Sequence, residues 1–340
     1  MIEYRETVLP ELSAAQVPNG TIYHLKGAYQ LHEGSRIIVP VNRSYAPDIN
    51  GDRELKKAQL RYRKNKLIHE DAKQDSAIEE GELLVDVYGK PLLFLQNNGG
   101  LMWYSSHYEE NSAVSSASRK LADTIKEGLL HSGFSNEYRL GVYGSHQPSL
   151  NGVDSDLDLI AWVKWDIKDE FTARVAAILQ QGGYRSSKET GKDAEYAARY
   201  SKRLNIPVLA GWYLAHKRMR WMSQNGVSTS LQCLNAEYDH TAAKQFLKGV
   251  NELWEGEEVS YECNVLAASS SYNFPKVWKV EADGRIFDVI SFSWTHQGMG
   301  DDNGRFGSRY IFQGSKVTNN YGEFLYLRGE DHYLLPKDLL

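Results

Sequence analysis

The sequence predicts an α+β protein in which a central part with both helices and strands lies between two β-rich parts. Helical periodicity, with apolar residues three and four positions apart, is clearest in the middle of the chain. Before and after it, short β-type runs are separated by turn-forming Gly, Asn and Pro. The 340 residues exceed what one hydrophobic core usually serves, so we expect several modules.

The composition narrows the class of protein. Hydrophobic residues make up 41% and charged residues 24% of the chain, which is typical of globular proteins and excludes a disordered chain. The net charge of −5 argues against a protein that coats nucleic acid through an overall positive field. Cys233 and Cys263 form no disulfide framework or zinc motif, and no apolar run is long enough for a membrane span. We therefore expect a cytoplasmic protein with no membrane partner.

The N-terminal module, residues 1–115, is predicted to be β-rich with a charged helical insertion. A turn signal at residues 88–91 predicts a strand pair around it. The insertion, about 53–68, has Leu55, Leu60 and Leu67 as its sparse apolar side. The predicted strands are Thr21–Lys26, Arg36–Val41, Glu82–Tyr88 and Pro91–Gln96.

The central module, residues 116–257, alternates helices and strands. Ser116 or Ser118 can cap its first helix, which runs to Leu130 and stops near Gly133. A turn at residues 224–226 predicts a hairpin near its end. The predicted strands are Tyr138–Tyr143, Leu157–Val163, Arg218–Ser223 and Val227–Leu234, and further helices cover about 168–181 and 193–204.

The C-terminal module, residues 258–340, is predicted to be all-β. Asp283-Gly284 is a strong hairpin turn. A succession of short strands without helices predicts a small β-barrel or OB-like module, with a β-sandwich as the alternative. These strands are Val259–Leu266, Val277–Val280, Ile286–Phe292, Ser308–Phe312 and Glu323–Leu327.

One segment of the central module carries chemistry. A hydrophobic strand ends in Gly144-Ser145, and after ten residues Asp156-Leu157-Asp158 opens the next strand. Side chains alternate along a strand, so Asp156 and Asp158 point the same way. Paired carboxylates form a hard-oxygen site for Mg²⁺ or Mn²⁺. Gly144 allows close backbone approach to a phosphate, and Ser145 can donate hydrogen bonds to it.

An alternative explains part of this segment without function. Asp154, Ser155 and Asp156 are also good turn formers after Asn151-Gly152. That reading accounts for Asp154, but it accounts poorly for Asp158, because aspartate is disfavoured inside an apolar strand.

The combination of Gly144, Ser145, Asp156 and Asp158 resembles the signature of the DNA polymerase beta superfamily of nucleotidyltransferases. The resemblance covers roughly residues 116–235 and implies a mixed sheet with helices. It implies an enzyme that moves an NMP from an NTP to an acceptor hydroxyl, possible acceptors being RNA, DNA or protein, and releases pyrophosphate. The layout is also similar to uncharacterised predicted nucleotidyltransferases, mostly archaeal, with β-rich flanks.

The chain departs from that family at the third carboxylate. The superfamily normally supplies it from a later strand, here Val227–Leu234, where Ser230 and Gln232 occupy the expected positions. Asp288, on an apolar strand face, is our candidate for the missing catalytic acid, and Glu262 is a weaker one. Alternatively, Asp288 lies on a solvated strand face or is paired with a base. Without a third acid, the alternative is a catalytically silent nucleotide- or nucleic-acid-binding protein.

Basic residues near this core are candidates for nucleotide binding. Lys217, Arg218 and Arg220 could offset the charge of the leaving pyrophosphate, or form a solvated strand end. A dense basic run over residues 53–66 could track a nucleic-acid backbone, or form one solvated helix face. A third reading makes the core a scaffold for flanking modules that bind RNA or a protein. The rings that either stack on bases or fill the barrel core are Tyr261, Tyr272, Trp278 and Trp294.

Overall fold

The chain is described by a computed structural model in which two compact units are distinguished, and each is treated by itself. Unit 1 comprises residues 1–106, 243–255 and 318–322, and unit 2 comprises the rest. In the first hundred residues, side chains are described only at 12–16 and 22–24. The structure describes residues 3–6, 12–16, 22–25, 29–33, 36–39, 41–47, 55–58, 60–63, 66–69, 83–85, 91–96, 102–147, 155–239, 241–249, 255–301, 309–327 and 331–340.

Unit 1 is β-rich, as predicted. One five-stranded sheet has the order β1-β4-β5-β11-β10 and another β12-β2-β3-β6-β7, while β8 and β9 pair with each other. Helix α5 (Thr241–Lys248) lies mostly in this unit. The strands are β1 (Glu3–Glu6), β2 (Ala14–Gln16), β3 (Ile22–Leu25), β4 (Tyr29–Glu33), β5 (Arg36–Val39), β6 (Val41–Pro47), β7 (Leu55–Ala58), β8 (Leu60–Arg63), β9 (Lys66–His69), β10 (Leu83–Val85), β11 (Pro91–Gln96) and β12 (Met102–Tyr104).

The helix predicted over about 53–68 is wrong, because β7, β8 and β9 occupy that stretch. Arg63 pairs with Lys66, which leaves two residues between β8 and β9, the commonest length of a hairpin connection. Helices in proteins draw most of their stability from packing an apolar face, and three spaced leucines provide little of one. Strand pairing satisfies the backbone without that face.

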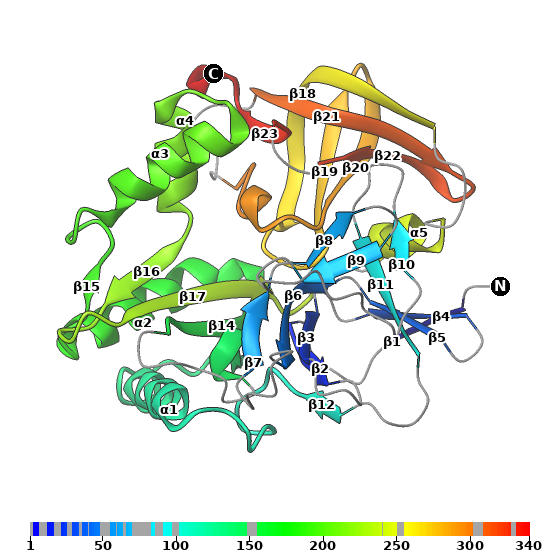
Figure 1. The fold of residues 1–340 in the computed structure, drawn as a ribbon. Coiled ribbons are helices and arrows are strands. Elements are labelled where there is room, and N and C mark those ends of the chain that lie inside the picture. The colour runs from blue at the N-terminus through cyan, green and yellow to red at the C-terminus, as the bar shows by residue number, and fades with distance from the viewer. Residues whose placement is uncertain are drawn as a thin grey trace. The chain divides into compact units, whose positions relative to one another are not determined.

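The first part of unit 2 is a mixed five-stranded sheet with helices, ordered β13-β14-β17-β16-β15 (Figure 1). β13 and β14 are antiparallel, and β14 and β17 are parallel. The elements are α1 (Ser116–His131), β13 (Tyr138–Tyr143), β14 (Leu157–Val163), α2 (Lys168–Gln181), β15 (Arg185–Ser186), α3 (Lys192–Leu204), α4 (Val208–His216), β16 (Met219–Met222) and β17 (Ser228–Asn235).

Most of these elements match the predicted ones, with three differences, one of which is that the short strand β15 was not predicted. The N-cap of α1 is Ser115, whose Oγ accepts from the Ser118 amide at 3.3 Å, in place of Ser116 or Ser118. Helix α4 was not predicted. Its residues are apolar nearly all round and many are buried, so no polar face reveals a helical period.

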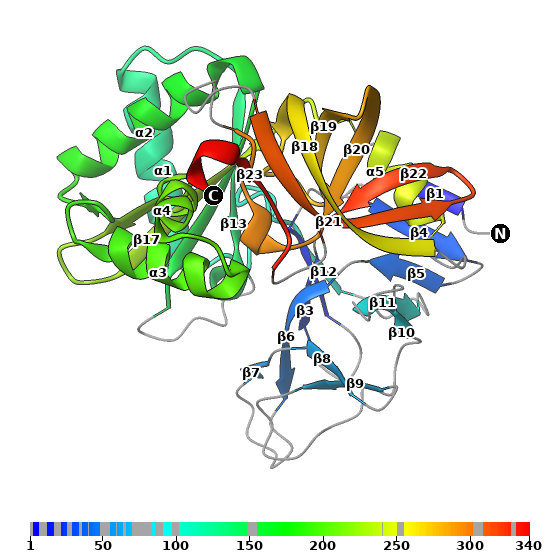
Figure 2. The ribbon, with the colours of Figure 1, turned by 90° about the horizontal axis from the view of Figure 1, so that it is seen from above.

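The two faces of this sheet differ in character. Leu157, Leu159 and Val163 of β14 are buried in one hydrophobic cluster with residues of α1 and α2. Figure 2 shows α1 and α2 side by side, and Gly128 of α1 packs closely against Ile178 of α2. Because side chains alternate along a strand, β14 turns its even-numbered residues to the opposite face. That face is therefore free to carry polar side chains such as Asp158.

The C-terminal part of unit 2 is a small barrel, which confirms that prediction. Strands follow the order β18-β19-β20-β22-β21, and a further pairing of β18 with β21 closes the ring of five. β23 is added beside β21. The strands are β18 (Glu255–Ser270), β19 (Lys276–Ala282), β20 (Arg285–Ser291), β21 (Arg309–Asn319), β22 (Gly322–Tyr326) and β23 (Tyr333–Pro336).

The barrel and the mixed sheet's helices share one hydrophobic cluster. Leu204 of α3 and Leu214 of α4 are buried in the same cluster as Val280 and Phe312 of the barrel. The division expected between residues 257 and 258 lies inside strand β18. The central and C-terminal parts thus belong to a single unit, with a common core.

Candidate functional site

A row of polar residues crosses four neighbouring strands of the mixed sheet. Tyr143 of β13 lies opposite Asp158 of β14, Asp158 opposite Ser230 of β17, and Ser230 opposite Arg220 of β16. Residues directly opposite each other project from the same face of a sheet. The row therefore lies on the face turned away from α1 and α2, and it begins where the strand before Gly144 ends.

Hydrogen bonds fix the carboxylate of Asp158 within this row. Ser230 Oγ donates to Asp158 Oδ1 at 2.7 Å, and the hydroxyls of Tyr143 and Ser230 lie 3.3 Å apart. Asp158 Oδ2 faces Gly144, where a Cβ atom would come within 3.1 Å of it. Gly144 has φ +76°, in the left-handed region that favours glycine. The motif residues Gly144 and Asp158 are thus brought into contact.

We expect Gly144→Ala to weaken both folding and ligand binding. Left-handed backbone costs a residue with a Cβ about 1–2 kcal/mol of unfolding free energy, and the new methyl group would crowd Asp158 Oδ2. Gly133→Ala is the matched control, since Gly133 has φ +73° and open space around its Cβ position. Denaturant unfolding should show similar losses for both variants, whereas calorimetry should show weaker Mg-NTP binding for Gly144→Ala alone. Equal binding by both variants would contradict the role of Gly144.

His146 anchors the loop that carries Gly144 and Ser145. Its Nδ1 lies 2.7 Å from Ser115 Oγ, and its carbonyl accepts from the Ser115 amide at 2.9 Å. Its Nε2 lies 3.4 Å from the Ser155 carbonyl oxygen. Burial lowers the pKa of His146 and so favours the neutral ring. The imidazole is buried and ties the loop to the start of α1, a role that no local sequence signal reveals.

The two aspartates of the motif offer oxygen ligands with different exposure. Asp156 is exposed just before β14, and Asp158 is half-buried. Mg²⁺ is typically held by one or two carboxylates together with phosphate oxygens and water, so this donor set fits it. Glycine at 144, where a Cβ would crowd the carboxylate, keeps space beside Asp158 Oδ2. Across the described part of the chain, no three His, Cys, Asp or Glu side chains gather to hold a metal ion.

The predicted third acid is not brought to this site. Ser230 stands opposite Asp158, and Gln232 is buried with its Nε2 donating to the Tyr272 carbonyl oxygen at 2.9 Å. Asp288 lies on β20 of the barrel, where its Oδ1 accepts from Lys279 Nζ at 2.8 Å. Glu262, also in the barrel, pairs with Arg309 and Lys337. The alternative that Asp288 is paired with a base describes what the structure contains.

Of the three basic residues predicted to bind nucleotide, Arg218 and Arg220 contact tyrosines of α3, whereas Lys217 contacts a tyrosine of α4. Arg220 is in the polar row, and its guanidinium lies 3.6 Å from the ring centroid of Tyr196. Arg218, two residues earlier, lies over Tyr200 at 5.4 Å. Lys217 caps the end of α4 and its Nζ lies over the Tyr213 ring at 5.0 Å.

Of the rings proposed for base stacking, Trp278 belongs to the hydrophobic cluster that includes the barrel, and Tyr261 packs against that cluster. Trp278 is 1% exposed and donates its Nε1 hydrogen to the Met299 carbonyl oxygen at 2.6 Å. Tyr272 is buried, and Tyr261 packs against buried Phe287. The side chains of Trp294 and of the basic run at 53–66 lie outside the described residues.

Neither cysteine is suited to act as a nucleophile. Burial raises the pKa of both the Cys233 and Cys263 thiols to about 12, whereas the thiolate is the reactive form.

Two further findings concern the chain as a whole. Among the residues that the structure describes, no helix has the length and apolar character needed to cross a membrane. No family model, curated protein or solved structure matches this chain.

Proposed function

We propose that this protein binds an NTP with Mg²⁺ and transfers the NMP to an acceptor hydroxyl, as in the polymerase beta superfamily. The observation that carries the proposal is the contact between Gly144 and Asp158 at the start of β14, with Asp156 beside it. The strand, loop and Asp-X-Asp strand of the signature lie in a mixed sheet that follows a helix, which supports the same reading.

The residues divide the work as follows. Backbone at Gly144 and the Ser145 hydroxyl would hold phosphate oxygens. Asp156 and Asp158 would hold Mg²⁺, which supplies neutralisation of the phosphate charge that builds up during transfer. The acceptor oxygen forms a bond to the α-phosphorus, the bond to the pyrophosphate oxygen breaks, and the hydroxyl proton passes to water. A cytoplasmic location would provide both NTP and Mg²⁺.

A second candidate function is nucleotide binding without transfer. The specific observation that favours it is Ser230, which stands opposite Asp158 where the family supplies its third carboxylate. A serine hydroxyl is a poor general base at neutral pH, so the acceptor hydroxyl would lack a side chain to deprotonate it. Under this reading the site would still bind Mg-NTP.

One pair of measurements tests both functions. Each α-labelled NTP is incubated with RNA, DNA and protein acceptors, and Mg-NTP binding is followed by calorimetry. Transfer that disappears in Asp156→Ala/Asp158→Ala supports the enzyme. Mg-dependent binding without transfer or pyrophosphate release supports the silent protein. Absence of Mg-dependent binding of any NTP would reject both.

We expect Ser230→Asp to raise transfer activity. The new carboxylate would stand beside Asp158 and accept the acceptor proton, an effect typically worth about 10²–10⁴-fold in rate. Part of this gain would be offset by repulsion from Asp158, so we expect about tenfold. Ser230→Asn is the control, because it has nearly the same size without the charge. A label-transfer assay that gives equal rates for both variants would show that a third acid is not what the site lacks.

The barrel fold is compatible with a nucleic acid as the acceptor. Its closed ring of five strands is compatible with an OB-like module, a class that binds oligonucleotides on an outer face. RNA or DNA therefore stays in the acceptor set of the transfer assay, although the buried Trp278 and Tyr272 do not supply the stacking surface.

A further inference from the structure

Two arginines and two tyrosines contact each other in a cluster beside the polar row. Arg218 and Arg220 are two residues apart on one face of the chain at β16, and Met219 and Trp221 turn to the opposite, apolar face. Tyr196 and Tyr200 are four residues apart on α3 and so share a face of that helix. Each tyrosine ring lies against one guanidinium, Tyr196 against Arg220 and Tyr200 against Arg218.

The charge of Arg220 is not balanced within the described part of the protein. Its Nη1 is buried and makes no hydrogen bond, and no described carboxylate forms an ion pair with it. Burial and the neighbouring charge of Arg218 both lower the pKa of Arg220. A buried donor of a charged group is costly to leave unsatisfied, and an ordered water, an ion or a ligand commonly supplies the missing acceptor.

The cluster lies next to the candidate nucleotide site. Arg220 is opposite Ser230, and Ser230 donates to Asp158. The arginines thus lie on the Ser230 side of Asp158, whereas Gly144 directly follows β13, the strand on the other side of β14. An anion held here would be close to the reacting groups without using the Gly144-Ser145 loop.

We infer that Arg218 and Arg220 form a phosphate-binding subsite on the Ser230 side of Asp158. Guanidinium groups present planar pairs of N–H donors that match phosphate oxygens, and the tyrosine rings hold both groups in place. Two neighbouring guanidinium groups can donate to several oxygens of one phosphate. The bound phosphate group belongs either to the acceptor or to the nucleotide. Only the identity of the molecule that carries it rests on the proposed function.

The test is calorimetric titration of the full chain with inorganic phosphate in EDTA, where no metal can contribute. We expect phosphate binding that Arg220→Gln weakens at least tenfold, and Arg218→Gln similarly. Arg199→Gln is the matched control, because it removes the same charge at an exposed position. The Arg199 guanidinium lies over the same Tyr196 ring at 5.5 Å. No binding by the wild type, or equal weakening by Arg199→Gln, would overturn the inference.

A second variant and a second ligand complete the design. Arg220→Lys keeps the charge but loses the planar donors, so it should also weaken phosphate binding, and it serves if Arg220→Gln fails to fold by circular dichroism. Unchanged phosphate affinity in folded Arg220→Lys and Arg218→Gln would again overturn the subsite. Mg-ATP titration then identifies the source: weaker binding in the Arg220 variant assigns the phosphate to the nucleotide, and unchanged binding assigns it to the acceptor. If the wild type binds no Mg-NTP, the proposed function is rejected, whereas the evidence from the phosphate titration for the arginine subsite is unaffected.

Discussion

Asp158→Asn is expected to abolish Mg-dependent NTP binding and to lower any nucleotidyl transfer by about 100-fold or more. The fold holds the Asp158 carboxylate in the proposed metal site, since Ser230 donates to one oxygen and Gly144 leaves space at the other. Asparagine keeps the shape but removes the negative charge that a hard cation requires. Electrostatic stabilisation by a bound ion typically contributes several kcal/mol at the transition state, which corresponds to factors of this size.

Calorimetry with Mg-NTP and the label-transfer assay measure the two effects separately. Asp283→Asn, in the turn between β19 and β20, removes the same charge away from the site and should change neither. If Asp158→Asn binds Mg-NTP as tightly as the wild type, the Asp-X-Asp pair does not form the metal site, and the resemblance to nucleotidyltransferases would concern the fold alone.

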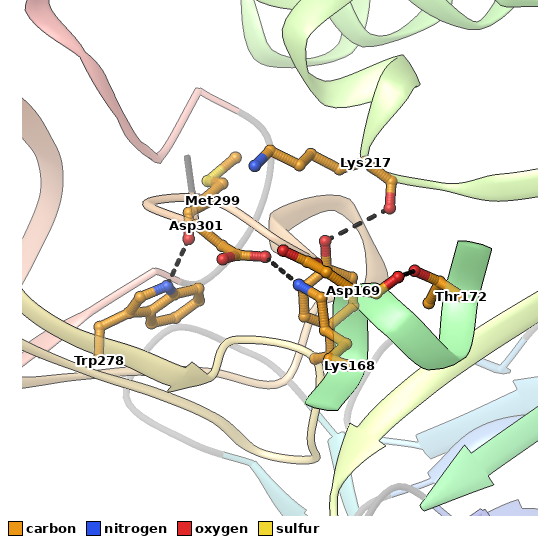
Figure 3. Close-up of polar contacts among 8 residues, drawn as sticks. Lys168, Asp169, Thr172, Lys217, Trp278, Met299 and Asp301 are labelled. Carbon is orange, nitrogen blue, oxygen red and sulfur yellow. Dashed lines mark hydrogen bonds and ion pairs between the residues drawn. The ribbon is translucent and has the colours of Figure 1, made fainter. Parts of the chain in front are cut away.

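Asp301→Ala is expected to destabilise unit 2 by about 3–5 kcal/mol, because it leaves a buried lysine without its partner. Lys168 Nζ, at the start of α2, lies 2.7 Å from Asp301 Oδ2, and their side chains are 14% and 6% exposed (Figure 3). The ammonium also lies 4.1 Å from the Trp165 ring centroid and 5.0 Å from that of Tyr272. Urea unfolding followed by tryptophan fluorescence gives the change in free energy.

The double variant Lys168→Met/Asp301→Leu separates a lost ion pair from a lost shape. Replacing both charges with apolar groups of similar volume is often close to neutral, so it should recover most of the stability. If Asp301→Ala costs less than about 1 kcal/mol, the pair behaves as a solvated surface contact. If the double variant is as unstable as Asp301→Ala, packing and not charge explains the loss.

Local patterns predicted the central sheet well. Strands β13 and β14 occur with the predicted bounds, because each is a short, largely apolar run between turn residues. Helix α4 was missed because a buried helix shows no polar stripe. The spaced leucines of the charged stretch at 53–68 predict a helix wrongly, and its charges carry no information on which strands pair.

Local patterns likewise predict one part of the candidate site and not the other. Gly144-Ser145 and Asp156-Leu157-Asp158 are local motifs, and their proximity follows from one connection between adjacent strands. The row from Asp158 through Ser230 to Arg220 depends on the parallel register of β14 with β17, which no local signal encodes. Asp288 was proposed from its position on an apolar strand face, and the cross-strand position of Lys279, which pairs with it, is likewise a matter of register.

The cluster that joins α3 and α4 to the barrel makes these parts a single cooperative unit. Elements that share one core open together, so their amide hydrogens exchange with solvent at similar free energies. Tyr196 and Tyr200, the two rings that hold Arg220 and Arg218, lie on α3, within that unit. Changes in barrel packing at Val280 or Phe312 would therefore alter how often the helix that holds the arginine cluster unfolds together with the barrel.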